Sequence, residues 1–206
     1  MPTICSRVLA FATVVILGGC AASPGYIGPD VPTDLTESRH QYHGFSVRPP
    51  IGSGWFVRVS EQGHDRATYR HTLTTKTHTF VADVSLMQMD TSLSTEEALV
   101  PHGFANAERY QVLENSHELD HSRKTTCIRY SIRLKDKGAP NAPPGSPLVL
   151  IDRGLVCAHP TIPGRAVRAS YSERGLEEEL DPRLWSDFEE FLGGVQIESA
   201  PGIPAA

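Results

Sequence analysis

Apolar and polar residues alternate along much of this chain, which is the pattern of β-strands that bury one face. The clearest run spans residues 78–89, and its apolar positions are Phe80, Ala82, Val84 and Leu86. Similar runs cover residues 44–47, 55–60, 67–73, 124–134, 148–158 and 167–173. Because short alternating strands separated by turn residues are typical of antiparallel sheets, we expect an antiparallel sheet of about six or seven strands.

A helical pattern replaces this alternation near the end of the chain. The apolar residues of segment 182–192 that fall on one stripe of a helix are Leu184, Trp185, Phe188, Phe191 and Leu192. Asp181 suits the N-cap and Pro182 the first helical position, while Gly193 and Gly194 would end the helix. The segment is therefore predicted to be an amphipathic C-terminal helix.

A second helix is predicted to begin at Ser94. Its side chain and that of Glu97 have the spacing of a capping box, in which each satisfies a backbone N–H of the first turn. Pro101 should interrupt this helix before residues 105–110. With few helices and many strands, the fold class is predicted to be α+β, with the antiparallel sheet flanked by helices.

The N-terminus carries the features of a bacterial export signal. Arg7 precedes an apolar run, residues 8–17, that is too short to span a bilayer, for which a helix needs roughly 20 apolar residues. The sequence Leu17-Gly18-Gly19-Cys20 resembles the lipobox of bacterial lipoproteins. The resemblance implies cleavage before Cys20, lipidation of its thiol and acylation of the new amine, which together give stable membrane attachment. The alternative is an ordinary secretory signal followed by a chance cysteine.

The domain organisation follows from this signal. Residues 1–19 are predicted to be the signal peptide, 20–40 a flexible tether rich in Pro and Gly, 41–198 a single α+β domain, and 199–206 a disordered tail. Ala21 and Ala22 follow the cysteine, whereas an aspartate there would resemble the inner-membrane retention signal of some enteric lipoproteins. The expected location is therefore the outer membrane, if the host has one.

Charge narrows the classes of partner. The formal net charge is −5, and the sequence contains no basic cluster. Nucleic-acid-binding domains need such a cluster to neutralise phosphates, so nucleic acid is not an expected partner.

The four cysteines have separate expected fates. Cys5 would leave with the signal and Cys20 would take the lipid, which leaves Cys127 and Cys157 for a disulfide in an oxidising compartment. These two lie in strand-like runs on either side of residues 136–147, a Pro- and Gly-rich segment that is typical of a hairpin loop and an expected contact surface. Free thiols or a redox pair are the alternatives, but a redox pair usually has C-x-x-C spacing, which is missing.

A pairing of Cys127 with Cys157 would fix the register of this hairpin. It would place Arg129 opposite Leu155, Ser131 opposite Arg153 and Leu134 opposite Leu150. Closure of a loop of about 30 residues should contribute on the order of 3 kcal/mol to stability, mostly by restricting the unfolded chain.

The order of elements is similar to that of the PsbP/Mog1-like fold. The residues that carry this resemblance are Phe45-Ser46-Val47, a proline-bearing loop and Gly54-Trp55, followed by a strand meander and the C-terminal helix. The resemblance implies an antiparallel sheet flanked by helices. Members of that group are photosystem accessory subunits or bind a small GTPase, and neither activity transfers without a matching functional motif.

One segment suggests zinc chemistry. His117-Glu118-Leu119-Asp120-His121 is an H-E-x-x-H pattern, which on a helix would let His117 and His121 bind zinc while Glu118 activates water. The charge of Asp120 and the polar residues 122–124 argue against a buried helix here, and no third ligand has recognisable spacing. A chance match is therefore the alternative interpretation.

Two other sites have competing interpretations. His40 and His43 could contribute to a metal site, although two histidines without a third ligand are more often solvated. Arg174, which precedes the acidic run 177–179, could contact a partner or could pair with a nearby carboxylate.

The function expected from the sequence is that of a lipid-anchored, non-catalytic envelope protein. It would bind an envelope protein or surface ligand, without a cofactor, at a membrane reached through Cys20. The alternative is a zinc-dependent hydrolase that uses His117, Glu118 and His121.

Overall fold

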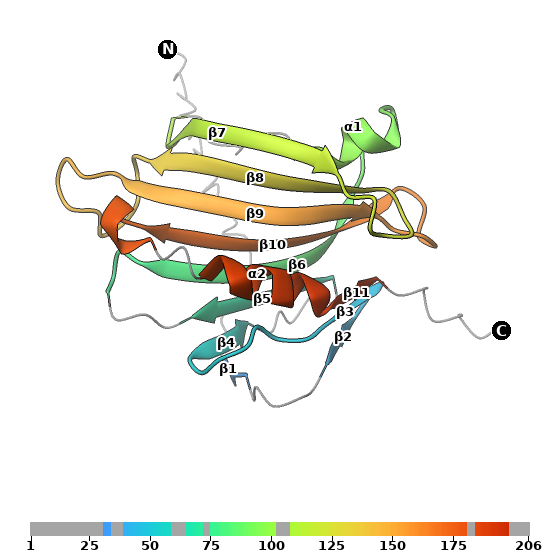
Figure 1. Ribbon diagram of the computed structural model, residues 1–206, viewed down its shortest axis with the longest axis horizontal. Coiled ribbons are helices and arrows are strands. Elements are labelled where there is room, and N and C mark those ends of the chain that lie inside the picture. Colours follow the sequence, from blue (N-terminus) through green and yellow to red (C-terminus); the bar gives the residue numbers. More distant parts are fainter. Residues whose placement is uncertain are drawn as a thin grey trace, which may run out of the picture.

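The computed structural model describes residues 31–33, 39–58, 65–71, 75–101, 108–180 and 184–197. An eight-stranded antiparallel sheet dominates it (Figure 1). In spatial order its strands are β1 (Val31–Pro32), β4 (Trp55–Arg58), β5 (Arg66–His71), β6 (Thr79–Gln88), β10 (Arg165–Gly175), β9 (Leu148–Ala158), β8 (Cys127–Asp136) and β7 (Tyr110–Leu119). A small sheet contains β11 (Val195–Ile197), β3 (Phe45–Val47) and β2 (His40–Tyr42).

The predicted α+β class and antiparallel arrangement are confirmed, and the strands are more numerous than expected. Every alternating run in the sequence became a strand. The additional strands β1, β2 and β11 are only two or three residues long, too short to show a period. β7 was missed for a different reason: its side chains are exposed on both faces, so nothing requires apolar residues at every second position.

The main core lies on the face of the large sheet that α2 (Leu184–Gly193) covers. In Figure 1, α2 lies in front of β6 and β5 and beside β10. Phe188, Phe191 and Leu192 of α2 are buried against Tyr69 of β5 and Tyr171 of β10. The residues of β3 and β11 complete the same core.

A second, smaller core lies on the opposite face, over β8 and β9. The helix α1 (Thr95–Leu99) contributes Leu99, which is buried with Ile128, Ile132 and Leu134. The two faces of β8 and β9 therefore differ: the α1 side is apolar, and much of the α2 side is polar.

Both predicted helices are present. Ser94 caps α1, and Ser94 and Glu97 form the expected capping box. The helix ends at Leu99, before Pro101, as predicted. The helix α2 ends at Gly193, in agreement with the predicted stop, whereas the predicted cap at Asp181 and Pro182 lies outside the described residues.

The predicted tether of residues 20–40 falls only partly in the described chain. Val31 and Pro32 pair with Val57 and Phe56 of β4, so this short stretch belongs to the sheet. The signal peptide, Cys20 and the tail 199–206 lie outside the described residues. None of the helices that the structure describes has the length and hydrophobicity needed to cross a membrane.

Candidate functional site

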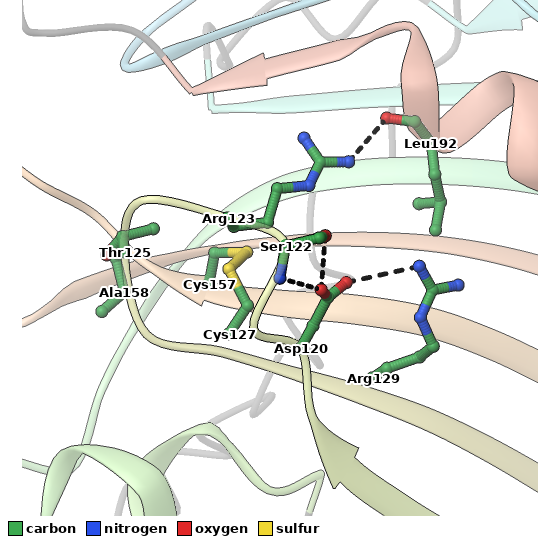
Figure 2. The surroundings of a disulfide bond; sticks show 9 residues. All are labelled: Asp120, Ser122, Arg123, Thr125, Cys127, Arg129, Cys157, Ala158 and Leu192. Atoms are coloured by element: carbon green, nitrogen blue, oxygen red, sulfur yellow. Dashed lines mark hydrogen bonds and ion pairs between the residues drawn. A yellow bond between two sulfur atoms is a disulfide. The ribbon is translucent and has the colours of Figure 1, made fainter.

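A disulfide joins Cys127 of β8 to Cys157 of β9, as predicted (Figure 2). The two residues are direct cross-strand partners with Cα atoms 4.1 Å apart, and both are buried. The whole predicted register is confirmed, including Arg129 opposite Leu155 and Ser131 opposite Arg153. The bond therefore joins adjacent strands at the margin of the main core, which includes both cysteines.

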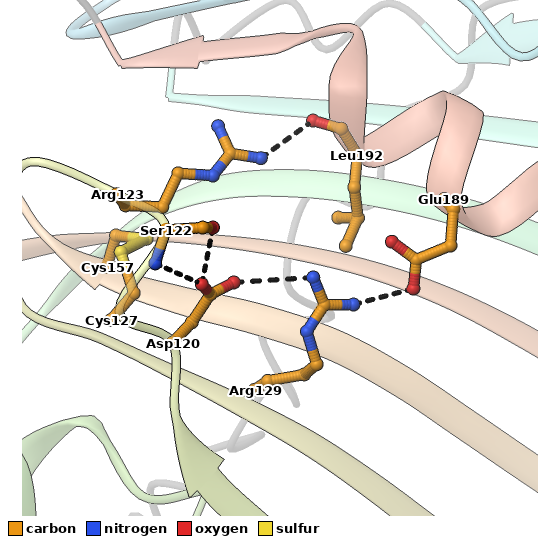
Figure 3. A network of polar contacts seen from close by, with 8 residues as sticks. All are labelled: Asp120, Ser122, Arg123, Cys127, Arg129, Cys157, Glu189 and Leu192. Carbon is orange, nitrogen blue, oxygen red and sulfur yellow. Dashed lines mark hydrogen bonds and ion pairs between the residues drawn. A yellow bond between two sulfur atoms is a disulfide. The ribbon is translucent and has the colours of Figure 1, made fainter.

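Two arginines connect the same hairpin region to α2. Arg123 Nη2 donates to the carbonyl oxygen of Leu192 at 3.3 Å, near the C-terminus of α2. A cation is favourable there because the last carbonyls of a helix carry partial negative charge. Arg129 Nη1 donates to Glu189 Oε1 at 2.6 Å, one turn earlier (Figure 3). The helix is thus held over β8 by both its backbone and its side chains.

Asp120 extends this network into the turn between β7 and β8. It accepts hydrogen bonds from the Ser122 hydroxyl, from the Ser122 amide at 2.9 Å, and from Arg129 Nη2 at 3.3 Å. The Ser122 hydroxyl holds the pKa of Asp120 below its usual value, and the Ser122 amide and the Arg129 charge act in the same direction against partial burial. Arg129 therefore lies between two carboxylates, one on the turn and one on α2.

A pocket of about 390 Å³ opens beside this network, between α2 and the strands β7, β8 and β9. Its lining residues include Ser116, Glu118, Arg129, Ser131, Arg153 and Phe188. Opposite charges and hydroxyl groups suit hydrogen bonding to a polar partner. Since Arg129 is an arginine that stays protonated and already bridges two carboxylates, it is a poor proton donor or acceptor for catalysis.

The structure contradicts the zinc-site interpretation of residues 117–121. His117 and Glu118 lie on the strand β7, and His121 lies in the turn that follows. A zincin needs the two imidazoles on successive turns of one helix, and on a strand His117 and Glu118 point to opposite faces. Within the described ranges, no three His, Cys, Asp or Glu side chains are grouped to hold a metal ion. The pattern is a chance match, and the hydrolase hypothesis is wrong.

The two histidines of the other candidate metal site, His40 and His43, contact different residues. His40 Nδ1 lies 2.9 Å from the Tyr69 hydroxyl, and burial lowers the pKa of His40. His43 Nδ1 lies 3.2 Å from Asp65 Oδ1 at an exposed position. Each histidine has its own neighbour, so the two do not form a common site.

The strand β7 is the outermost strand of the large sheet, with β8 on its inner side. Its ten residues are almost entirely exposed. Three of the large apolar side chains exposed in the described part of the chain lie on it: Val112 at 56%, Leu113 at 45% and Leu119 at 38% exposure. A register shift between Val112 and Glu114 bulges the strand at Leu113. β7 therefore presents both main-chain groups and apolar side chains at one edge.

Arg174 of β10 lies on the face of the large sheet opposite α2, and its side chain is largely buried. Its side chain is 22% exposed, and its Nη1 lies 3.7 Å from Oδ2 of the fully buried Asp136. The interpretation of Arg174 as the neighbour of a carboxylate is confirmed, while its role in partner contact stays a prediction. Arg174, Arg70 and Ser172 line a second pocket of about 290 Å³.

Asp136 was expected to begin the exposed loop 136–147, but it is the last residue of β8 and is buried. Arg109 holds it with two hydrogen bonds, at 2.8 and 2.7 Å. Burial disfavours the charge of Asp136, but the hydrogen bonds and the positive charge of Arg109 outweigh burial and lower its pKa. No local pattern could have found this pair, because its partners are separated by 27 residues and meet only in the fold.

A second buried carboxylate lies further along the same face. Asp152 accepts from Arg168 Nη2 at 2.7 Å and from the Tyr130 hydroxyl at 3.1 Å. Burial raises the pKa of Asp152 to about 6, although Arg168 and Tyr130 both stabilise its charge. The two aspartates shift in opposite directions because their neighbours differ: Asp136 also accepts a hydrogen bond from the Gly138 amide and lies near a second arginine, Arg174, whereas Asp152 lies near the like charge of Asp83.

No known protein family matches the sequence, and no curated protein does. Among solved structures, the chain is similar to cyanobacterial PsbP (CyanoP) from Synechocystis sp. PCC 6803, with 13% identity over 88% of this chain and 99% of that chain and a TM-score of 0.43. It is also similar to the Ran-binding protein Mog1p of Saccharomyces cerevisiae, with 9% identity over 78% of this chain and 95% of that chain and a TM-score of 0.45. At these identities and TM-scores, no role of either protein transfers to this chain.

Proposed function

We propose that this chain is a lipid-anchored protein of the bacterial cell envelope, attached through Cys20, whose folded domain is a non-catalytic binding module. Its location would be the outer membrane, if the host has one. The partner would be an envelope protein or a surface ligand that meets the domain at a distance from the bilayer set by the residues after Cys20.

The observation that most supports this location is the disulfide between Cys127 and Cys157. The two cysteines are buried, directly opposed and bonded. Structural disulfides persist in the periplasm and outside the cell, whereas cytosolic thiols are kept reduced. An exported chain also agrees with the apolar run 8–17 and with the cysteine that follows Gly18 and Gly19.

A binding role is supported by the polar side chains around α2, because these side chains form structural contacts within the domain. Arg129 bridges Asp120 and Glu189, and Arg123 holds the end of the helix, so their charges hold the scaffold together. The remaining features of this end of the sheet are a polar pocket and an exposed strand edge. A partner can bind to both surfaces without being chemically changed there.

The anchor is tested with a Cys20→Ser variant in a bacterial host. The variant should stay a full-length precursor without lipid, because the thiol that accepts the diacylglyceryl group is gone. A Cys5→Ser variant is the matched control, since Cys5 leaves with the signal, and it should mature and incorporate labelled palmitate as the parent does. Normal maturation and labelling of the Cys20→Ser variant would contradict the anchor.

The binding role is tested by cross-linking in intact envelopes. A photoreactive residue placed at Ser116, which lines the pocket and lies on β7, should cross-link to one discrete partner. The same residue at Glu96 on α1 should not give that product, because α1 packs on the opposite face. Equal products from both positions, or none from any exposed position of the domain, would contradict a specific binding module.

A further inference from the structure

The outer edge of β7 has the properties of a site for strand addition. Nine of the ten residues of this strand pair with β8 on one side, and no other described strand lies on the other side. An edge strand exposes a row of N–H and C=O groups that can pair with another chain, and proteins usually protect such edges with Pro, Lys or a covering element. β7 contains neither Pro nor Lys and is bulged only near its start, at Leu113.

The side chains of β7 define what could pair with it. By register, Glu114, Ser116 and Glu118 lie opposite Arg133, Ser131 and Arg129, on the α2 face. On the other face, Val112 lies opposite Leu134 and Leu119 opposite Ile128, both part of the smaller core. An added strand would therefore meet two carboxylates on one face and two apolar side chains on the other.

The two carboxylates are available for a partner because their cross-strand arginines are engaged elsewhere. Arg133 pairs with Glu177, and Arg129 pairs with Glu189 and Asp120. Glu114 and Glu118 themselves form no ion pair with any residue that the structure describes, and both are exposed. The edge is thus acidic at two positions that lie four residues apart.

This charge pattern disfavours a second copy of the chain as the occupant. Two β7 strands related by a two-fold axis would run antiparallel and place residues of the same face opposite one another. In the register centred on Ser116, Glu114 of each copy would face Glu118 of the other. Like charges directly opposite each other are destabilising, so the edge suits a different chain with positive charge.

We propose that β7 accepts an extended segment of a partner protein as an additional antiparallel strand. The partner segment would carry Lys or Arg at two positions four residues apart, opposite Glu118 and Glu114, with an apolar residue outside each, opposite Leu119 and Val112. Main-chain hydrogen bonds would give affinity, and the alternating side chains would give specificity. This inference rests on the proposed function, because it names the partner of the binding module.

The test uses a synthetic seven-residue peptide with blocked ends: valine, lysine, three threonines, lysine and valine. Titration calorimetry with the mature chain purified from membranes should show binding with one peptide per chain. A peptide with glutamate in place of both lysines should bind at least roughly tenfold more weakly, because both charge contacts become repulsive. A lysine peptide with N-methylated amides should lose binding, because strand pairing needs its N–H groups.

Charge reversal on the protein completes the test. The double variant Glu114→Lys/Glu118→Lys should reverse the preference and bind the glutamate peptide more tightly than the lysine peptide. Glu96→Lys, a reversal at an exposed position of α1, is the matched control and should bind as the parent does. Equal affinity for all three peptides, an unchanged preference in the double variant, or a dimer of the parent that the double variant loses would each overturn the proposal.

A failure of the strand-addition proposal can be distinguished from a failure of the proposed function. If the peptide does not bind but a partner cross-links elsewhere on the lipidated domain, strand addition is wrong and the envelope binding module stands. If the peptide binds but the Cys20→Ser variant matures and takes up palmitate normally, the anchor is wrong and the strand site stands.

Discussion

The two ends of the large sheet are stabilised in different ways. Under α2, the strands β5, β6 and β10 share an apolar core in which Phe191 lies within ring-contact distance of Tyr69 and Tyr171. On the same face at the other end, β7, β8 and β9 carry charged side chains, and a disulfide and arginine ion pairs take the place of apolar packing. We call these the covered end and the open end of the sheet.

The difference shows how a chain can keep a surface available without losing the strands that carry it. Apolar packing of the α2 face at the open end would have required a covering element over β7. A covalent bond restricts the unfolded chain and covers nothing in the folded one. The disulfide therefore stabilises the hairpin of β8 and β9 and leaves β7 exposed beside it.

The largest contrast is expected from truncation of one apolar side chain at each end. Phe191→Ala should lower the free energy of unfolding by about 3–5 kcal/mol, because Phe191 is buried and the cavity would not refill. Leu119→Ala on β7 should change it by no more than about 0.5 kcal/mol. Urea denaturation of both variants measures this, and equal costs would show that β7 is not an open edge.

Loss of the disulfide should have the next largest effect. The double variant Cys127→Ala/Cys157→Ala is expected to lose about 3 kcal/mol, from the greater freedom of its unfolded chain. Reductant should destabilise the parent by a similar amount and leave the double variant unchanged, which serves as the control. A double variant as stable as the parent would show that strand pairing, ion pairs and the smaller core hold the open end without the disulfide.

The buried carboxylate Asp152 should give the open end a distinct pH dependence. Its pKa is raised to about 6 in the folded state, so the folded chain holds more protons than the unfolded chain between pH 4 and 6. Its contribution to stability is therefore fully present below about pH 4 and is lost as the pH rises through 6. The stability difference between the parent and Asp152→Asn, followed by urea denaturation across this range, should fall with rising pH. A difference that grows with pH would contradict the raised pKa.

The smallest expected effect concerns the contact between Arg129 and Glu189. The Glu189 side chain is 60% exposed, so water and salt screen this pair. A double-mutant cycle with Arg129→Ala and Glu189→Ala should give a coupling energy of about 0.2–1 kcal/mol that falls in 1 M salt. A coupling well above this range that resists salt would contradict a weak, screened contact and would mean that this ion pair contributes substantially to holding α2 over β8.

The sequence was most informative where one physical requirement determines several residues at once. Pairing Cys127 with Cys157 determined the whole β8–β9 register, because antiparallel partners have a constant sum of residue numbers. The capping box at Ser94 and the glycine stop of α2 were equally local and were found.

The features that could not be predicted from the sequence depend on contacts between distant segments or on the exposure of both faces of a strand. β7 lacks alternation because neither of its faces is buried, and for the same reason residues 117–121 could be taken for a helix. Arg129 and Glu189 are 60 residues apart, and Arg109 and Asp136 meet only after β8 pairs with its neighbours. The candidate site contains both predictable and unpredictable features. Its disulfide was predicted from the sequence, whereas its exposed edge strand, β7, was not.

The central claim, that β7 is an open edge that accepts a partner strand, is tested most directly by amide hydrogen exchange of the mature chain with and without the lysine peptide. Amides on the outer side of β7 should exchange rapidly in the protein alone and become protected with the peptide bound. Those of β10, which is paired on both sides, should be slow in both states. Protection that appears elsewhere while β7 continues to exchange would contradict the claim.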